Sequence, residues 1–237
     1  MNRAQTLFVT GTDTGVGKTH ACVALLGGLV AAGVRAVGMK PVAAGIEAGA
    51  SANADVDALA RAGNVEAPPG DRNPYAFAEA IAPHVAAERE GRSIDLERIA
   101  EAHARLAARA EAIIVEGAGG PLVPIGGRSD MLDVATRLRA RVLLVVGVRL
   151  GCLSHALAAE LAIRARGLEF AGWIANRIDP AMAAADASVA TLAARLPGPM
   201  VADLAWGEAG PLPADALVRA GFGSFRVDPA GPIRAAT

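Results

Sequence analysis

The chain has 237 residues, of which 53% are hydrophobic and 20% charged, a balance that excludes a disordered chain and predicts one or two globular domains. A net charge of −1 provides no long-range field to attract nucleic acid or an anionic membrane, so neither is expected as a partner. The longest apolar run, residues 21–34, is too short for a membrane-spanning helix. Cys22 and Cys152 have no disulfide or zinc spacing, which predicts a cytoplasmic protein.

Short apolar runs alternate with longer helical patterns, which is typical of the α/β class with a mainly parallel sheet flanked by helices on both faces. The expected strands are residues 6–10, 36–40, 112–116, 142–148, 170–176 and 200–204. Residues 43–83 lack a sustained period and predict loops with one short helix. Another short helix is expected near residues 214–220, and a poorly defined tail from about residue 221. No repeat divides the chain, so we expect a single domain over residues 1–237.

A glycine-rich segment follows the first expected strand, where residues 11–19 are GTDTGVGKT. Gly15 and Gly17 allow backbone N–H groups to curl around phosphate oxygens, and the N-terminus of the next helix adds partial positive charge. Lys18 can then reach the β and γ phosphates, while Thr19 supplies a hydroxyl of the kind that ligates Mg²⁺. These features predict a nucleoside triphosphate site in a P-loop NTPase-like fold.

The loop departs from the common pattern G-x-x-x-x-G-K, because its first glycine is Gly11 and Thr12 stands where glycine is usual. The alternative is a glycine turn with an incidental Lys-Thr pair. It has little support, since strand, loop, Lys-Thr pair and helix all coincide.

Two acids and a second lysine are candidates to complete the site. Glu116 ends an apolar strand before a glycine-rich turn, at the sheet edge where α/β proteins bind ligands. Asp57 lies in the loop segment and is either a site residue or the cap of a short helix. Lys40 ends the second strand before Pro41, which keeps the chain extended toward the phosphates, although lysine is also common on surfaces.

The remaining nucleophiles and histidines give weaker signals. Ser154 and His155 are adjacent and no G-x-S-x-G motif is present, which excludes a serine hydrolase of that type. His20 and Cys22 on the helix after the loop are more typical of packing residues than of metal ligands.

Several separated motifs together resemble the dethiobiotin synthetase family of P-loop enzymes. They are residues 9–19 (VTGTDTGVGKT), 38–42 (GMKPV), 73–77 (NPYAF) with 83–84 (PH), 115–120 (VEGAGG), 145–155 (VVGVRLGCLSH) and 172–176 (GWIAN). The resemblance implies an enzyme that converts 7,8-diaminononanoate, CO₂ and ATP into dethiobiotin, ADP and phosphate, through a carbamate and a carbamic-phosphoric anhydride. It also implies Mg²⁺ as cofactor and a homodimer whose substrate site lies near the subunit interface.

The resemblance further implies roles for individual residues. Lys40 and Lys18 would be catalytic, and Thr19, Asp57 and Glu116 would hold Mg²⁺. The ATP site would comprise Thr14, Gly15, Val16, Gly17, Lys18, Thr19, His20, Asp57, Glu116, Gly117, Ala118, Gly119, Asn176, Arg177, Ala205, Trp206 and Gly207. Asn176 would contact the adenine edge, and residues 205–207 would cover the base. The substrate site would comprise Thr14, Lys40, Ala44, Gly119, Gly151, Cys152 and Ser154.

The chain departs from the family pattern at a few positions. Ala44 stands where a serine hydroxyl is frequent, Arg149 where lysine is common, and Ala80 and Ala205 where proline is frequent. Since a neutral hydrogen bond is worth about 1 kcal/mol, Ala44 predicts weaker substrate binding rather than loss of activity.

Two other functions fit parts of the sequence. A partitioning or site-selection ATPase would share the fold, but that group usually carries an extra lysine early in the loop, where this chain has Thr12, Asp13 and Thr14. A related ATP-dependent ligase or amidotransferase acting on a different acid, or a catalytically inactive homologue, is not distinguished by Lys40 and Ala44.

Overall fold

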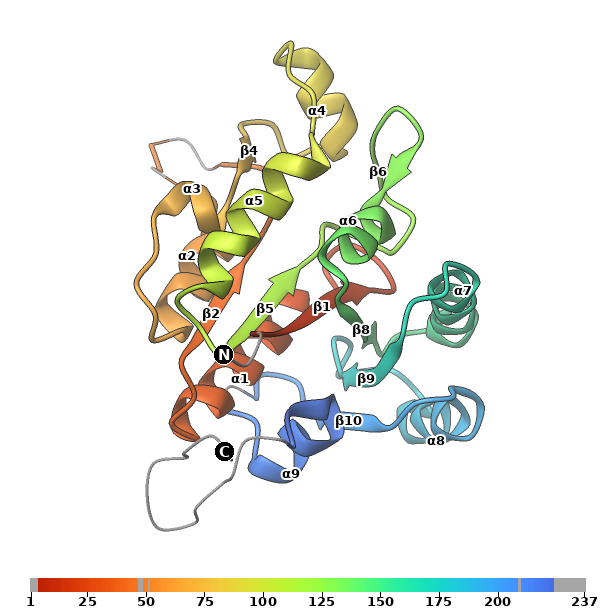
Figure 1. Cartoon of the computed structure of the whole chain (residues 1–237). Helices are drawn as coiled ribbons and strands as arrows, with labels where there is room; N and C mark the ends of the chain where they lie inside the picture. The colour runs from red at the N-terminus through yellow and green to blue at the C-terminus, as the bar shows by residue number, and fades with distance from the viewer. Residues whose placement is uncertain (1–3, 47–48, 51, 209, 224–237) are drawn as a thin grey trace.

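The computed structural model describes residues 4–46, 49–50, 52–208 and 210–223 (Figure 1). Its central sheet has six parallel strands in the order β10-β9-β8-β1-β5-β2. These strands are β1 (Gln5–Gly11), β2 (Ala36–Met39), β5 (Ala112–Glu116), β8 (Arg141–Gly147), β9 (Phe170–Asn176) and β10 (Met200–Leu204). Two small sheets pair β3 (Val42–Ala44) with β4 (Tyr75–Phe77) and β6 (Pro124–Gly126) with β7 (Ser129–Asp130). The helices are α1 (Lys18–Ala31), α2 (Ala54–Ala62), α3 (Pro69–Arg72), α4 (Pro83–Arg89), α5 (Leu96–Ala107), α6 (Met131–Leu138), α7 (Cys152–Ala165), α8 (Ala185–Arg195), α9 (Ala214–Leu217) and the π-helical turn η1 (Val218–Phe222).

The α/β class and the strands of the central sheet are confirmed, with ends that differ by no more than one residue from those expected. The expectation for residues 43–83 was wrong in part, because β3 and β4 pair there and two helices, α2 and α3, are present. Each of those strands has three residues, too few to give a periodic signal. The helix near residues 214–220 is confirmed by α9 and η1, whereas the expected tail lies outside the described residues beyond residue 223.

Successive side chains of the strands enter different hydrophobic layers, as the pleat requires. Leu7 and Val9 of β1 pack in the layer that contains Leu25 of α1, while Phe8 enters the layer that contains Ile99 of α5. Helices therefore cover both faces of the sheet (Figure 1). No helix in the described part of the chain is long and apolar enough to cross a membrane.

The order of the strands determines where a ligand can bind. β1 lies between β5 and β8, and the chain runs from β1 to the edge strand β2 before it returns through β5 to β8 on the other side. The connections between strands therefore lead to one side of β1 for β2 and β5, and to the other side for β8, β9 and β10. Because the carboxyl ends of parallel strands meet at one edge, the segments after β1, β5 and β8 lie around a crevice at this point.

The surroundings of two adjacent glycines on α1, Gly27 and Gly28, predict how alanine substitutions would change stability. A Cβ on Gly28 would lie 2.4 Å from the carbonyl oxygen of Leu212, whereas a Cβ on Gly27 would lie 3.3 Å from Cβ of Pro211. Leu212 is held against the helix by its N–H, which donates to the carbonyl of Ala24 at 2.9 Å. We expect Gly28→Ala to lower the free energy of unfolding by about 1–3 kcal/mol. Urea denaturation measures it, with Gly27→Ala as the control, and equal midpoints for the two variants would contradict the prediction.

Candidate functional site

The glycine-rich loop joins β1 to α1 and leaves the N-terminus of the helix without a side-chain cap. Gly17 is the residue before the helix and has φ +85°, a left-handed conformation that side chains disfavour. Gly11, the displaced first glycine, is needed for close packing, because a Cβ there would lie 2.7 Å from the Val16 side chain. Uncapped N–H groups at a helix N-terminus form a ready site for an anion.

Lys18 is the first residue of α1 and is buried beside the loop. Its Nζ donates to the backbone carbonyl of Asp13 at 3.0 Å. The Asp13 carboxylate accepts from the Thr14 N–H at 2.7 Å and pairs with Arg149 at 2.6 Å, which ties the loop to the segment after β8. These contacts hold the loop curled around the position of the Lys18 ammonium.

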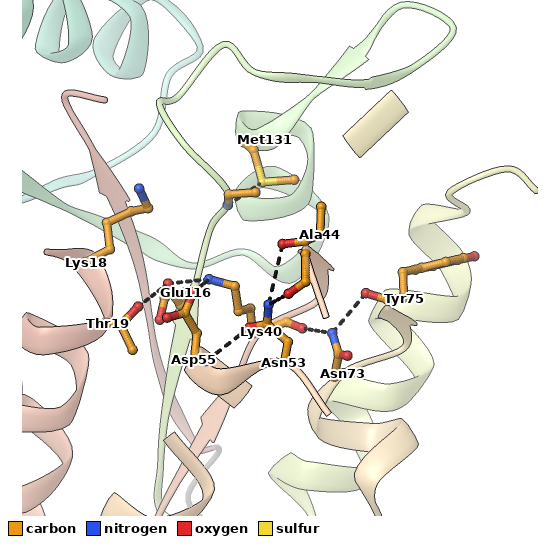
Figure 2. Close-up of polar contacts among 12 residues, drawn as sticks. Lys18, Thr19, Lys40, Ala44, Asn53, Asp55, Asn73, Tyr75, Glu116 and Met131 are labelled. Carbon is orange, nitrogen blue, oxygen red and sulfur yellow. Dashed lines mark hydrogen bonds and ion pairs between the residues drawn. The ribbon is translucent and has the colours of Figure 1, made fainter. Parts of the chain in front are cut away.

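Lys40 lies between two carboxylates just beyond the end of β2 (Figure 2). Its Nζ is 2.5 Å from Glu116 Oε1 and 2.7 Å from Asp55 Oδ2. Thr19 donates its hydroxyl to the same Glu116 oxygen at 2.9 Å. Glu116 at the end of β5 is only 1% exposed, so its charge and that of Lys40 interact where little water screens them, whereas Asp55 is partly exposed.

The backbone of Lys40 is fixed by the segment that precedes β4. Asn73 donates its side-chain N–H to the carbonyl of Lys40 at 2.6 Å and to that of Tyr75 at 2.9 Å (Figure 2). The Lys40 N–H donates to the carbonyl of Arg72 at 2.8 Å. Residues that are distant in sequence therefore aim the Lys40 side chain into the site.

Burial and charge act differently on the two lysines, which are the only lysines of the chain. Burial lowers the pKa of Lys18, and the positive charge of Lys40 adds to this effect against the opposing carboxylates. Burial also opposes the charge of Lys40, but Glu116 and Asp55 outweigh it and its pKa is raised. Burial would raise the pKa of Asp55, yet the Lys40 charge prevails and lowers it. Lys40 and Asp55 are thus held charged as a pair.

The oxygen atoms near Thr19 have the chemistry of a magnesium site. Glu116 Oε2 is buried and has no hydrogen-bond partner among the described residues, and Asp55 is kept ionised beside it. The part of the chain that the structure describes has no group of three or more His, Cys, Asp or Glu able to hold a metal ion. Two carboxylates and a hydroxyl suit Mg²⁺, which is usually bound by one or two carboxylates together with substrate phosphates.

These groups face one cavity of about 770 Å³. The predicted residues that line it are Thr14, Gly15, Gly17, Lys18, Thr19, His20, Lys40, Ala44, Glu116, Ala118 and Gly119. Its apolar wall is made by Val42, Ile81, Pro83 and Val123. Val42 and Pro83 belong to motifs of the family resemblance, but none of the four was predicted as a site residue. Both lysines thus enter the same cavity, and a phosphate at the loop would lie beside an apolar surface suited to an alkyl chain.

Asp57 is the predicted metal ligand that the structure places away from the cavity. It lies on the exposed face of α2 and does not line the cavity, whereas Asp55 does. The helix begins at Ala54, and Asn53 caps it by accepting the Asp55 N–H at 3.1 Å. Residues two apart on a helix point about 200° apart, so Asp55 and Asp57 cannot both face the cavity. The signal that could have favoured Asp55 is the cap residue Asn53, because it fixes the start of the helix and thereby the directions in which Asp55 and Asp57 point.

Several other predicted residues lie outside the cavity. Val16 belongs to the loop, but its side chain is buried, and Asn176 donates its side-chain N–H to the Val16 carbonyl at 2.9 Å. Arg177 pairs with Asp186 and Asp203 at 2.7 and 2.8 Å. The cavity lining also omits Gly117, the segment Ala205, Trp206 and Gly207, and the substrate candidates Gly151, Cys152 and Ser154 at the start of α7. The cavity thus contains the glycine-rich loop, both lysines and two carboxylates, but neither the residues predicted to contact adenine nor those of α7.

Comparisons with known proteins identify the family and the fold of the chain. Residues 5–209 match a family model described as an AAA domain. The chain is 50% identical over 201 residues to the ATP-dependent dethiobiotin synthetase BioD of Nitrosospira multiformis, covering 85% of this chain and 88% of that protein. Among solved structures, the MinC:MinD cell division protein complex of Aquifex aeolicus is similar in fold, with a TM-score of 0.52 at 13% identity, covering 93% of this chain and 86% of that chain.

Proposed function

Because this chain belongs to the dethiobiotin synthetase family, it performs the ATP-dependent conversion of 7,8-diaminononanoate and CO₂ into dethiobiotin, and we propose that the cavity at the loop is its active site. The observation that carries this proposal is that the only two lysines of the chain face one cavity together with Asp55 and Glu116. In this proposal the ATP phosphates lie at residues 14–19, and the alkyl chain of the diamine lies along Val42, Ile81 and Val123.

The reaction gathers negative charge at each step. One amine of the substrate takes up CO₂ as a carbamate, and a carbamate oxygen attacks the γ-phosphoryl group, releasing ADP. The second amine then attacks the carbonyl of the mixed anhydride, which closes the ring and expels phosphate. We assign Lys18 to the β and γ phosphates and Lys40 to the carbamate, since phosphoryl transfer depends mainly on positioning and charge stabilisation.

Thr19, Asp55 and Glu116 are the residues that we propose hold Mg²⁺, with Asp55 in place of the expected Asp57. When bound, the ion would neutralise the charge of the phosphate oxygens. A divalent ion bound to Glu116 Oε2 and to Asp55 would compete with Lys40 for the negative charge of these two carboxylates. We therefore propose that Lys40 gives up part of its ion pairing when MgATP binds and donates to the carbamate instead.

A homodimer would give the α7 candidates a role. Gly151 and Ser154 are exposed at the start of α7, outside the cavity of their own chain. A groove of about 540 Å³ runs between residues 120–124 and α7, and Leu150, two residues before the start of α7, is 92% exposed. We propose that two copies meet here, so that α7 of one reaches the substrate of the other. Sedimentation of the wild type and of Leu150→Glu tests this, and a wild-type monomer under turnover conditions would contradict it.

The decisive assay mixes the protein with MgATP, bicarbonate and 7,8-diaminononanoate, and detects the cyclic urea by mass spectrometry alongside ADP. We expect one urea for each ADP, at a rate that requires all substrates. ADP formation without the urea would contradict the proposed site chemistry. An ATP-consuming biosynthetic step of this kind also supports our placement of the protein in the cytoplasm.

The absence of a side-chain hydroxyl at Ala44 leads to a prediction about the KM for the diamine. Ala44 lines the cavity, and its side chain cannot donate a hydrogen bond. A serine there would add one hydrogen bond to the substrate, so we expect Ala44→Ser to lower the KM for the diamine by about fivefold. The KM for ATP serves as the internal control and should stay unchanged. Steady-state kinetics with each substrate varied in turn measures both, and an unchanged or higher KM for the diamine would contradict this prediction.

A further inference from the structure

Asn176 makes an unusual contact for a residue at the end of a strand. It is the last residue of β9, two strands away from β1, and is 7% exposed. Its own carbonyl accepts the Val148 N–H at 2.8 Å, which fixes its backbone. Its side-chain Nδ2 donates to the Val16 carbonyl at 2.9 Å, so β9 is tied directly to the middle of the phosphate-binding loop.

The rest of the loop is built to keep this contact. Gly17 leaves room for it, because a Cβ there would lie 2.0 Å from Nδ2 of Asn176. The Val16 side chain is 1% exposed and packs against Gly11 and Gly147, either of which would clash with it if it carried a Cβ. Val16 is therefore anchored by its side chain on one side and by its carbonyl on the other.

A planar trans peptide points its C=O and the following N–H in opposite directions. The carbonyl of Val16 and the N–H of Gly17 belong to one such peptide. Gly17 lines the cavity and Asn176 does not, so a Val16 carbonyl that is bonded to Asn176 would direct the Gly17 N–H toward the cavity. Without this bond the Val16–Gly17 peptide could rotate. Part of the free energy of phosphate binding would then be used to return the peptide to the binding orientation, which weakens the apparent affinity.

We propose that Asn176 is a positioning residue of the phosphate-binding loop: its carboxamide orients the Val16–Gly17 peptide so that the Gly17 N–H donates to a phosphate oxygen. This role is additional to any contact with the adenine base. It rests on the proposed placement of the triphosphate in the loop, but the bond itself can be tested without any ligand.

The experiment compares Asn176→Ala and Asn176→Asp with the wild type. The matched control is Asn64→Ala, which removes another side-chain amide that joins two backbone groups, the Ala36 N–H and the Val34 carbonyl, far from the loop. Hydrogen exchange of amides 12–19 is measured in the ligand-free proteins. We expect faster exchange in both Asn176 variants, faster still in Asn176→Asp because its carboxylate repels the Val16 carbonyl, and wild-type exchange in Asn64→Ala.

Binding of ATP, GTP and inorganic tripolyphosphate is then measured for each protein. If Asn176 orients the peptide, Asn176→Ala weakens all three by roughly tenfold, because the phosphate site is common to them. A loss confined to ATP, or unchanged loop exchange, would overturn the proposal and leave Asn176 with a role at the base alone. Faster loop exchange together with a wild type that does not bind tripolyphosphate would instead overturn the placement of the triphosphate.

Discussion

Replacing Lys40 with Gln is expected to lower kcat by about 10²- to 10³-fold, because it removes a preorganised cation from the reacting oxygens. Lys40 lies 2.5 Å from Glu116 and 2.7 Å from Asp55, so it is positioned before any ligand arrives. ATP binding should change little, since Lys18 and the loop remain. Single-turnover formation of the cyclic urea and ATP titration measure the two quantities separately.

The Gln variant leaves Glu116 buried without its cation, which destabilises proteins by several kcal/mol. Lys40→Arg is therefore the companion variant, because it keeps the charge and the ion pairs while replacing a compact ammonium by a planar guanidinium. We expect it to fold and still to lose about tenfold or more in kcat. Since the chain has only two lysines, ¹⁵N-lysine labelling gives two Nζ signals, and loss of one in Lys40→Arg assigns the other to Lys18. Near-wild-type kcat in a folded Lys40 variant would remove this residue from the mechanism.

Asp55→Asn should raise the Mg²⁺ concentration needed for half-maximal turnover by about 10- to 100-fold and lower the maximal rate. The change removes one anionic oxygen from the proposed metal site and one of the two carboxylates that hold Lys40. The reaction rate is measured over a Mg²⁺ series at fixed ATP. Mn²⁺ binding followed by electron paramagnetic resonance gives a second measurement that does not depend on catalysis.

Asp57→Asn is the matched control, because Asp57 lies on the same helix with the same charge but is exposed away from the cavity. We expect its Mg²⁺ dependence to stay within about twofold of the wild type, as is usual for exposed substitutions. A larger effect in Asp57→Asn than in Asp55→Asn would reverse the assignment made from the structure.

The positions of Asp55 and Asp57 show where the sequence is ambiguous. The two acids are separated by a single residue in the same short helix, and both fit a metal ligand by residue type. Only the start of α2 at Ala54 decides which of them faces the cavity, and helix boundaries are the least reliable part of a sequence-based assignment. Likewise, no motif marks Val42, Ile81 and Val123 as one wall, because they come from separate segments that meet only in the folded chain.

The sequence alone determined the parallel α/β sheet, the glycine-rich loop with its lysine, and the family. These features depend on local patterns, namely apolar runs with turn residues between them and the glycines that precede Lys18. The tertiary structure decided which acid joins Lys40, how Asn73 and Asn176 hold the site from other parts of the fold, and which predicted residues stay outside the cavity. Those outcomes depend on the order of the strands and on where each helix begins. Spacing along the chain does not contain that information, since it arises when distant segments pack against each other.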